Sequence, residues 1–338
     1  MNILAVESSC DETAVAIVKD GREVLADCIA SQVALHREFG GVVPEIASRK
    51  HIEAIYDLAD QALIKAGLTK NDIDAVAVTY APGLIGAVLV GVNFAKAAAL
   101  ALNRPLIPVH HICGHIAANY IAFSELKPPF LCLVVSGGHT MLVDVKNYTE
   151  MDILGTTLDD AAGECFDKVG RVLGMPYPGG AALDKAAQQG DPTMYALPCA
   201  KPGQNPYDMS FSGLKTATLN LIHHAEQVGE RLAINDLCAS FTESVSRTLI
   251  PRVKAALDQT GYNQLAVAGG VAANSRIRSD LYQLAQENSV NVFLPPLSLC
   301  GDNAAMIGAQ AYYEYLSGNV ADMCLNAYAT KSILGERL

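Results

Sequence analysis

Two histidines one helical turn apart are the first candidates for chemistry in this chain. His111 and His115 occur in the sequence His-Ile-Cys-Gly-His, and residues at positions i and i+4 lie on one face of a helix, roughly 5–6 Å apart. A Gly-Asp-Asn sequence that opens a later, corresponding helix supplies Asp302. Two histidines and one carboxylate with open coordination positions suit Fe(II) or Zn(II). We therefore predict a metal site at these residues; two solvated histidines on a helix surface are the alternative.

Two turns between alternating apolar runs carry the second set of candidates. Ser136, Gly137 and Gly138 form a glycine-rich turn, whose backbone N–H groups can approach an anion closely. The corresponding turn near the N-terminus instead places Asp11 and Glu12 at its tip. In this interpretation the glycine-rich turn binds a phosphate, and the acidic turn supplies a general base or helps to organise a metal site. Two ordinary tight hairpins would give the same pattern.

Further along the chain, residue spacing suggests nucleotide recognition. The pair Gly269-Gly270 separates a predicted strand from a helix that begins near Asn274, and a helix N-terminus favours negative charge. A plain strand–helix turn is an equal alternative. Asp160, Glu164 and Asp167 share one helix face, which would suit a ribose, although such acidic runs are usually solvated.

These residues are positioned by elements that occur twice in the chain. Short apolar runs separated by turn residues predict three strands, and each triplet is followed by helix, strand, helix, strand and helix. The first triplet covers 3–6, 13–18 and 23–28, and the second 130–135, 140–145 and 150–154. Later strands are predicted at 72–79 and 105–109 in one half, and at 263–268 and 290–294 in the other.

The repeat predicts a duplicated α/β fold with two lobes around a nucleotide-binding cleft, where ligands of such folds bind. We expect the N-terminal lobe at residues 1–110, completed by a C-terminal helix at 317–338, and the C-terminal lobe at 111–316. The second lobe is longer, and a mostly helical insertion at about 156–262 accounts for the difference.

Composition narrows the class of protein further. The 338 residues are 51% apolar and 17% charged, which indicates a core-rich globular chain, and the net charge of −11 argues against broad nonspecific nucleic-acid binding. Nine cysteines without a Cys-x-x-Cys pair indicate free thiols in a reducing cytoplasm. The N-terminus lacks a signal-peptide pattern. The uncharged segment Ala75–Ala95 contains Pro82 and several glycines, so we expect a strand, a turn and a helix rather than a membrane span.

Taken together, the ordered motifs resemble the TsaD family, formerly described as O-sialoglycoprotein endopeptidases, over nearly the whole chain. The motifs are VESSCDET, GGVVPEIASRKH, VHHICGH, VSGGHT, DDAAGECFDKVGR, YPGG, SFSGLKTA, AGGVAANSRIR and CGDNAAMI. The resemblance implies the actin/hexokinase/Hsp70-like fold. It also implies transfer of a threonylcarbamoyl group from threonylcarbamoyl-AMP to N6 of the adenosine 3′ of the anticodon in tRNAs that read ANN codons.

The resemblance also implies roles for individual residues and partners. His111, His115 and Asp302 match metal ligands, usually for iron, and Asp11 and Glu12 match a loop required for activity. The positions matching the adenylate site are Val134, Val135, Ser136, Gly137, Gly138, Asp167, Gly180, Asp184 and Asn274. The implied partners are tRNA, a TsaB-like dimerisation partner, a TsaE-like ATPase and a TsaC/Sua-type synthase that supplies the donor.

This resemblance suggests acyl transfer without a protein nucleophile, in which Asp11 or Glu12 accepts a proton. Candidate tRNA contacts are Arg49, Lys50, Lys168, Arg171 and Lys215. Three other functions compete. A metallopeptidase of the His-Glu-x-x-His type would need Glu at the position of Ile112. A sugar kinase would leave the histidine pair unexplained, and a noncatalytic nucleotide-binding scaffold would not need a complete ligand set.

Overall fold

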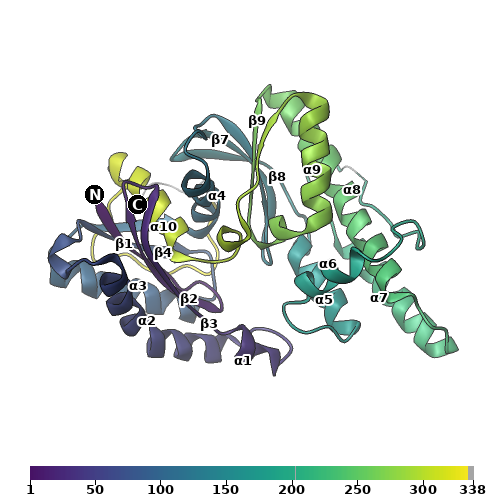
Figure 1. Ribbon diagram of the computed structural model, residues 1–338, viewed down its shortest axis with the longest axis horizontal. Coiled ribbons are helices and arrows are strands. Elements are labelled where there is room, and N and C mark those ends of the chain that lie inside the picture. The colour runs from purple at the N-terminus through teal and green to yellow at the C-terminus, as the bar shows by residue number, and fades with distance from the viewer. Residues whose placement is uncertain (202, 334–338) are drawn as a thin grey trace. The chain divides into compact units, whose positions relative to one another are not determined.

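The computed structural model describes residues 1–201 and 203–333, which form two mixed five-stranded sheets with helices packed on them (Figure 1). The strands are β1 Asn2–Glu7, β2 Glu12–Lys19, β3 Glu23–Ser31, β4 Ala75–Ala81, β5 Leu106–His110, β6 Phe130–Val135, β7 Thr140–Asn147, β8 Glu150–Thr156, β9 Gln264–Ala268 and β10 Asn291–Phe293. The α-helices are α1 Val33–Arg37, α2 Pro44–Ala66, α3 Ile85–Leu102, α4 His111–Ala122, α5 Ala162–Val172, α6 Gly179–Ala187, α7 Ser212–Val228, α8 Ile234–Thr260, α9 Ser275–Asn288 and α10 Ala304–Leu316. Short 3-10 helices are η1 Lys70–Asp72, η2 Gly270–Ala273 and η3 Leu297–Leu299.

Strand order confirms the predicted internal repeat. The first sheet has the order β3-β2-β1-β4-β5, and the second has β8-β7-β6-β9-β10 when it is followed from the matching edge. In each sheet the first strand of the repeat pairs antiparallel with the second and parallel with the fourth. The same connectivity written twice is what a duplicated α/β chain requires.

The first sheet belongs to a compact unit made of Met1–Pro128, Lys146–Asp152 and the chain from Pro295 onward. Side chains of β1 alternate between its two faces, as the strand period demands. Ile3 and Ala5 pack toward α4 and α10, whereas Leu4 and Val6 pack toward α2 and α3. The unit is therefore a sheet between two helical layers, and it buries both faces of its parallel strands.

Helix α3 is the one helix among residues 1–201 and 203–333 that is long and apolar enough to cross a membrane. It follows the buried strand β4 and a Gly/Pro turn, as predicted for Ala75–Ala95. Val88 and Val92 on α3 are buried in the core against β1 and β4. This packing identifies α3 as a core helix of the first unit.

The second compact unit contains Pro129–Val145 and Ile153–Leu294. Between β8 and β9 the chain forms α5, α6, α7 and α8, where the sequence predicted a mostly helical insertion. Helix α8 packs against both α6 and α9, and α5 packs against α6 and α7. These contacts connect the inserted helices to the helix that follows β9.

The compact units have different bounds from the predicted lobes, 1–110 with 317–338 and 111–316. Helices α4 and α10, expected in the second lobe, pack on the first sheet through residues such as Ala118 and Ile307. The predicted helix at 317–338 does not form in residues 317–333, and 334–338 lie outside the described residues. Gly318 instead turns the chain with a φ of 82°, and Ala321 pairs with Leu106 beside β5.

Candidate functional site

The structure brings together the three residues predicted as metal ligands. The rings of His111 and His115 lie with their centroids 4.6 Å apart on α4. Asp302 Oδ1 lies 3.5 Å from His111 Nε2 and 3.1 Å from His115 Nε2. One ligand atom from each residue falls within 4.8 Å of the other two, so a single cation could reach all three.

Two helix starts position this cluster. Strand β5 leads directly into α4, whose first residue is His111, and Asp302 immediately precedes Asn303, the N-cap of α10. Asn303 accepts a hydrogen bond from the backbone N–H of Met306, which fixes the start of α10. A Cβ on Gly114 would lie 2.6 Å from Ile307 Cδ1, so glycine there permits the close packing of α4 on α10.

The donor set fits a divalent cation. Both ring nitrogens of His115 are buried and make no hydrogen bond, although Nε2 lies close to Asp302. Burying a polar nitrogen without a partner costs free energy, and coordination of a metal would compensate this cost. Two imidazoles and one carboxylate, with Asp302 reachable from solvent, match an open site of the catalytic type.

Glu7 completes the cluster, in a role that residue spacing did not predict. Its side chain is fully buried at the end of β1, and its Oε2 accepts hydrogen bonds from Thr79 Oγ1 at 2.6 Å and from His111 Nδ1 at 3.0 Å. Its Oε1 accepts the backbone N–H of Ser9. A proton on Nδ1 leaves Nε2 of His111 free to coordinate a metal, which is the usual carboxylate–histidine–metal arrangement.

Charges of this cluster change the protonation of its members. Burial lowers the pKa of His111, but the negative charges of Glu7 and Asp302 outweigh burial and raise it to about 9. Burial raises the pKa of Glu7, but the interaction with His111 outweighs this and leaves it below its usual value. Glu7 is therefore an ionised, buried partner of His111. A carboxylate at the last position of a buried apolar strand is the sequence signal that could have identified it.

The predicted acidic pair lies in the same compact unit, with Asp11 in the turn after β1 and Glu12 as the first residue of β2. Burial raises the pKa of Glu12 to about 7, the hydrogen bond from Ser31 opposes this rise, and the charges of Asp11 and Asp302 add to it. Glu12 Oε1 accepts from Ser31 Oγ at 2.8 Å, whereas its buried Oε2 makes no hydrogen bond. A carboxylate with one free oxygen and a pKa near neutrality has the properties of a general base.

The predicted glycine turn lies in the second unit, where three backbone segments meet. Ser136 is followed by Gly137 and Gly138, which are both exposed, and no atom lies where their Cβ atoms would be. A Cβ on Gly163 would lie 2.5 Å from the Ser136 carbonyl oxygen, and one on Gly269 would lie 2.5 Å from that of Val135. Glycines therefore allow the start of α5 and the end of β9 to pack against this turn.

Other predicted adenylate residues organise the surrounding helices. Asp167 Oδ1 accepts the backbone N–H groups of Gly179, at 2.8 Å, and Gly180, at 3.3 Å, which caps α6. Asp184 Oδ1 accepts from the N–H and hydroxyl of Ser275, and Asn274 caps α9 through Ile277 N–H. These contacts link α5, α6 and α9.

Val134 and Val135 are fully buried in β6. Their side chains therefore serve the core, and only their backbone groups are suited to binding.

Two of the predicted tRNA contacts are paired with one acid, and a third is paired with another. Asp160 binds both Lys168, at 2.9 Å, and Lys215. These interactions overcome the burial of Asp160 and lower its pKa. Lys50 likewise pairs with Glu53 on α2. Arg49 and Arg171 are exposed and form no ion pair within the described part of the chain.

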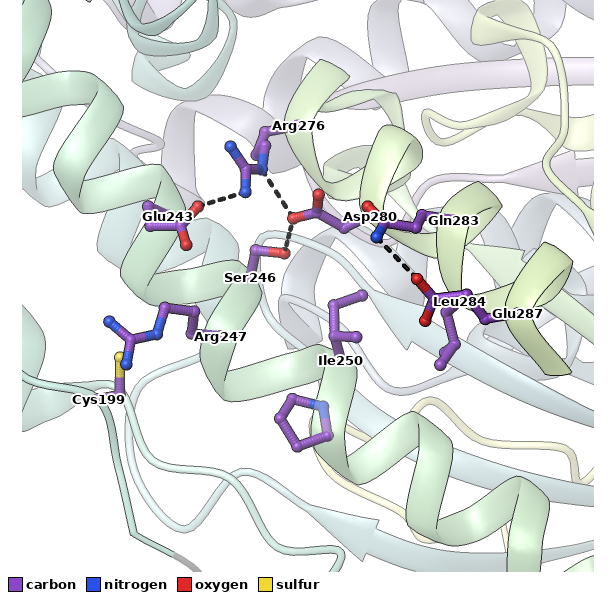
Figure 2. A pocket seen from close by; sticks show the side chains of 11 residues that line it. Cys199, Glu243, Ser246, Arg247, Ile250, Arg276, Asp280, Gln283, Leu284 and Glu287 are labelled. Atoms are coloured by element: carbon purple, nitrogen blue, oxygen red, sulfur yellow. Dashed lines mark hydrogen bonds and ion pairs between the residues drawn. The ribbon is translucent and has the colours of Figure 1, made fainter. Parts of the chain in front are cut away.

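A cavity of about 400 Å³ lies between α8 and α9 in the second unit (Figure 2). Arg276 bridges Glu243, at 2.6 Å, and Asp280, at 2.8 Å, and Ser246 donates to Asp280. The lining is thus largely engaged with itself. It includes none of the residues predicted to bind metal or nucleotide.

Comparison with known proteins points to one family. Residues 23–309 match the family model TsaD, described as tRNA N6-adenosine threonylcarbamoyltransferase. A protein of that description from Moorella thermoacetica is 54% identical over 326 residues, which cover 96% of this chain and 95% of the relative. One from Clostridium botulinum (strain 657 / Type Ba4) is 50% identical over 337 residues, which cover 100% of this chain and 99% of the relative.

Solved structures at much lower identity support the fold alone. HypF in a phosphate- and nucleotide-bound form superposes with a TM-score of 0.63 at 14% identity, covering 98% of this chain and 47% of that one. Component A of the Acidaminococcus fermentans (R)-2-hydroxyglutaryl-CoA dehydratase gives 0.55 at 15% identity, covering 94% and 98%. Both likenesses confirm the predicted actin/hexokinase/Hsp70-like architecture.

Proposed function

The chain belongs to the TsaD family of tRNA N6-adenosine threonylcarbamoyltransferases, and from this premise we propose how its residues divide the work of the transfer. The activity moves a threonylcarbamoyl group onto N6 of an adenosine in tRNA. The donor in our proposal is threonylcarbamoyl-AMP, and the acceptor is the adenosine 3′ of the anticodon in tRNAs that read ANN codons. Transfer of the threonylcarbamoyl group to N6 releases AMP from the donor.

His111, His115 and Asp302 hold a divalent metal in this proposal, with Fe(II) as the first choice and Zn(II) as the alternative. A cation there supplies Lewis-acid polarisation of the donor. Glu7 orients His111 through the Nδ1 hydrogen bond and keeps Nε2 directed at the cation. The observation that carries the proposal is the convergence of these three ligands, in which the buried ring nitrogens of His115 make no hydrogen bond and its Nε2 faces Asp302.

The adenylate part of the donor binds the second unit in this proposal. Backbone N–H groups of Gly137 and Gly138 face its phosphate, because these exposed glycines leave their N–H groups accessible to an anion. The N–H of Ser136 donates to the carbonyl of His139 and so holds the turn closed. Asp167, Gly180, Asp184 and Asn274 hold α6 and α9 in the arrangement that receives the nucleoside. Val134 and Val135 fix the strand from which the turn departs.

Asp11 and Glu12 carry the proton chemistry. The exocyclic amine of adenine is a weak nucleophile, and its attack on the carbamoyl carbon requires loss of a proton. Glu12 is the stronger candidate, because its pKa of about 7 and its free buried Oε2 allow it to accept that proton near neutral pH. The proton moves from N6 to the carboxylate, and the C–O bond to AMP breaks with its electron pair on the phosphate oxygen.

Exposed apolar residues of the first unit form the surface that binds a partner protein in this proposal. Ile52 and Tyr56 lie one turn apart on α2, and Ile85 and Leu89 lie one turn apart on α3, all exposed. Helices α2 and α3 pack on each other, so a TsaB-like dimerisation partner can bury both pairs. A TsaE-like ATPase and a TsaC/Sua-type synthase complete the cytoplasmic system.

The decisive test combines the chain, threonylcarbamoyl-AMP, its partners and unmodified tRNA, followed by mass spectrometry of the nucleosides. We expect N6-threonylcarbamoyladenosine with the intact chain and its loss in Asp302→Asn, together with loss of bound metal. Glu23→Gln, which changes an exposed glutamate on β3, serves as the control and keeps activity. A complete mixture that yields no modified adenosine would reject the proposal.

A further inference from the structure

A buried histidine outside the metal cluster holds the acidic turn from both sides. His51 lies on α2 and is fully buried. Its Nδ1 lies 2.7 Å from Thr13 Oγ1, and its Nε2 lies 2.9 Å from the backbone carbonyl oxygen of Cys10. Asp11 and Glu12 are the two residues between these anchors. One imidazole thus spans the whole acidic pair.

The partners of the ring determine where its protons are. A backbone carbonyl only accepts hydrogen bonds, so Nε2 of His51 carries the proton and donates to Cys10. Nδ1 then has a lone pair and accepts the hydroxyl proton of Thr13. Burial lowers the pKa of His51, with the hydrogen bond to Cys10 opposing it, so the neutral tautomer with both contacts persists near neutral pH.

Other contacts around the turn act in the same direction. The backbone N–H of Gln32 donates to the carbonyl of Asp11, and Ser31 donates to the carboxylate of Glu12. These groups come from the end of β3 and the residue that follows it, whereas His51 comes from α2. Together they leave the backbone of residues 10–13 little freedom, and the ring of His51 contacts both ends of the pair.

We propose that His51 is a positioning residue for the transfer reaction, which sets the orientation of Asp11 and Glu12 by holding Cys10 and Thr13. The inference rests on the proposed role of the two acids in proton transfer. His51 contacts neither donor nor acceptor in this account. Its loss should therefore lower kcat, because a displacement of about 1 Å at a reacting group costs up to roughly 100-fold in rate, without weakening tRNA binding or metal occupancy.

The test compares variants of the full chain in the complete transferase mixture. His51→Leu removes both hydrogen bonds, Thr13→Val removes one while keeping the shape, and His51→Gln retains a donor and an acceptor. We expect kcat to fall about 10- to 100-fold in His51→Leu, less in Thr13→Val, and to recover in His51→Gln. KM for tRNA and bound metal should stay unchanged. Thr13→Val keeps the test valid if His51→Leu does not fold.

Ile55 provides the matched control, because it lies one turn after His51 on the buried face of α2 and belongs to the apolar core. Ile55→Ala should destabilise the fold but leave kcat of the folded protein unchanged. If His51→Leu and Thr13→Val behave like Ile55→Ala, the positioning role is overturned.

The double variant Asp11→Asn/Glu12→Gln distinguishes failure of the proton-transfer role of the two acids from failure of the positioning role of His51. If this double variant is inactive, adding His51→Leu should cause no further loss in the residual rate, and a further loss would overturn the positioning role. If the double variant keeps full turnover, the proposed function of the acids fails, and the positioning role fails with it. Retained kcat in His51→Leu beside an inactive double variant would overturn the positioning role alone.

Discussion

At the scale of single residues, one buried carboxylate holds the histidine that begins the metal cluster. Glu7 is fully buried at the end of β1, and its Oε2 accepts hydrogen bonds from His111 Nδ1 and Thr79 Oγ1. A carboxylate behind a metal-binding imidazole fixes the orientation of the ring and raises its basicity as a ligand.

Removal of the negative charge from Glu7 should weaken metal binding. In Glu7→Gln the imidazole of His111 loses its ionised partner, and comparable changes behind a metal ligand lower affinity about 10- to 100-fold. Competition with a chelator, followed by metal analysis, measures the change. Glu53→Gln is the charge-matched control and should bind metal like the unchanged chain. Equal affinity in all three proteins would show that Glu7 does not tune the site.

Helix geometry alone places residues i and i+4 on one face, so His111 and His115 could be predicted from their spacing. The role of Glu7 could not, because it depends on β1 and β4 lying side by side, which brings Thr79 and Glu7 together. The role of His51 was missed for a similar reason, since its partners lie at both ends of a turn that is distant in sequence.

The ionisation of Glu12 should appear in the pH dependence of the reaction. Burial raises its pKa to about 7, so the basic form accumulates as the pH rises through 7, and kcat should rise with it. Glu12→Gln should lower kcat and abolish this limb of the profile. A variant that retains the same limb would assign it to another group.

The raised pKa of Glu12 also predicts how the stability of the fold depends on pH. Stability should fall as the pH rises, whereas kcat should rise. Because the folded-state pKa of Glu12 is raised, its contribution to stability is present at low pH and is lost as the pH rises through about 7. Glu12→Gln should therefore raise the melting temperature above pH 7 and have little effect below the unfolded-state pKa of roughly 4.3. Thermal unfolding at about pH 4 and about pH 8, on either side of this range, measures the difference. An equal shift at both pH values would contradict it.

At the scale of elements, local sequence predicted the strands better than their grouping. Period-two runs and turn residues identified both triplets of strands, since each signal lies within a few residues. The helices α4 and α10 were expected in the second lobe, because the predicted bounds of that lobe were residues 111–316. Their place on the first sheet depends on side-chain complementarity, such as Gly308 against Val18, which periodicity does not encode.

Alanine substitutions of two glycines at equivalent helix positions distinguish the effect of close packing from the effect of helix propensity. Gly163 is the second residue of α5, where a Cβ would meet backbone atoms of Ser136 and Gly137 at 2.5 and 2.7 Å. Gly213 is the second residue of α7, where a Cβ would meet nothing within 4 Å. Gly163→Ala should displace the glycine turn and weaken binding of an adenylate, measured by calorimetry.

Gly213→Ala should leave adenylate binding unchanged and stabilise the fold by up to about 1 kcal/mol, because alanine restricts the unfolded chain and favours the helix. Thermal unfolding of both variants completes the comparison. If Gly163→Ala and Gly213→Ala bound the adenylate equally well, the turn would not be part of its site.

At the scale of the whole molecule, the charge must be reconciled with an RNA substrate. The chain carries 24 basic and 35 acidic residues, a net charge of −11, and Lys168 and Lys215 are already paired with Asp160. Phosphate binding depends on cations that can release counterions. A few local contacts from unpaired basic residues must therefore supply the affinity of the chain for tRNA. We expect partner proteins to provide further basic surface.

Arg49 and Arg171 are the test of this view, because both are exposed and neither forms an ion pair within residues 1–201 and 203–333. Arg49→Glu and Arg171→Glu should weaken tRNA binding across sequences, and each lost phosphate contact should reduce the slope of log K against log salt by about 1. Lys168→Ala is the matched comparison and should change the slope less, since Asp160 and Glu164 already neutralise Lys168. Fluorescence titrations at several salt concentrations, with and without the partners, measure both quantities. Tight binding of tRNA by the chain alone at high salt would contradict the local-contact view, because screened charges could not sustain it.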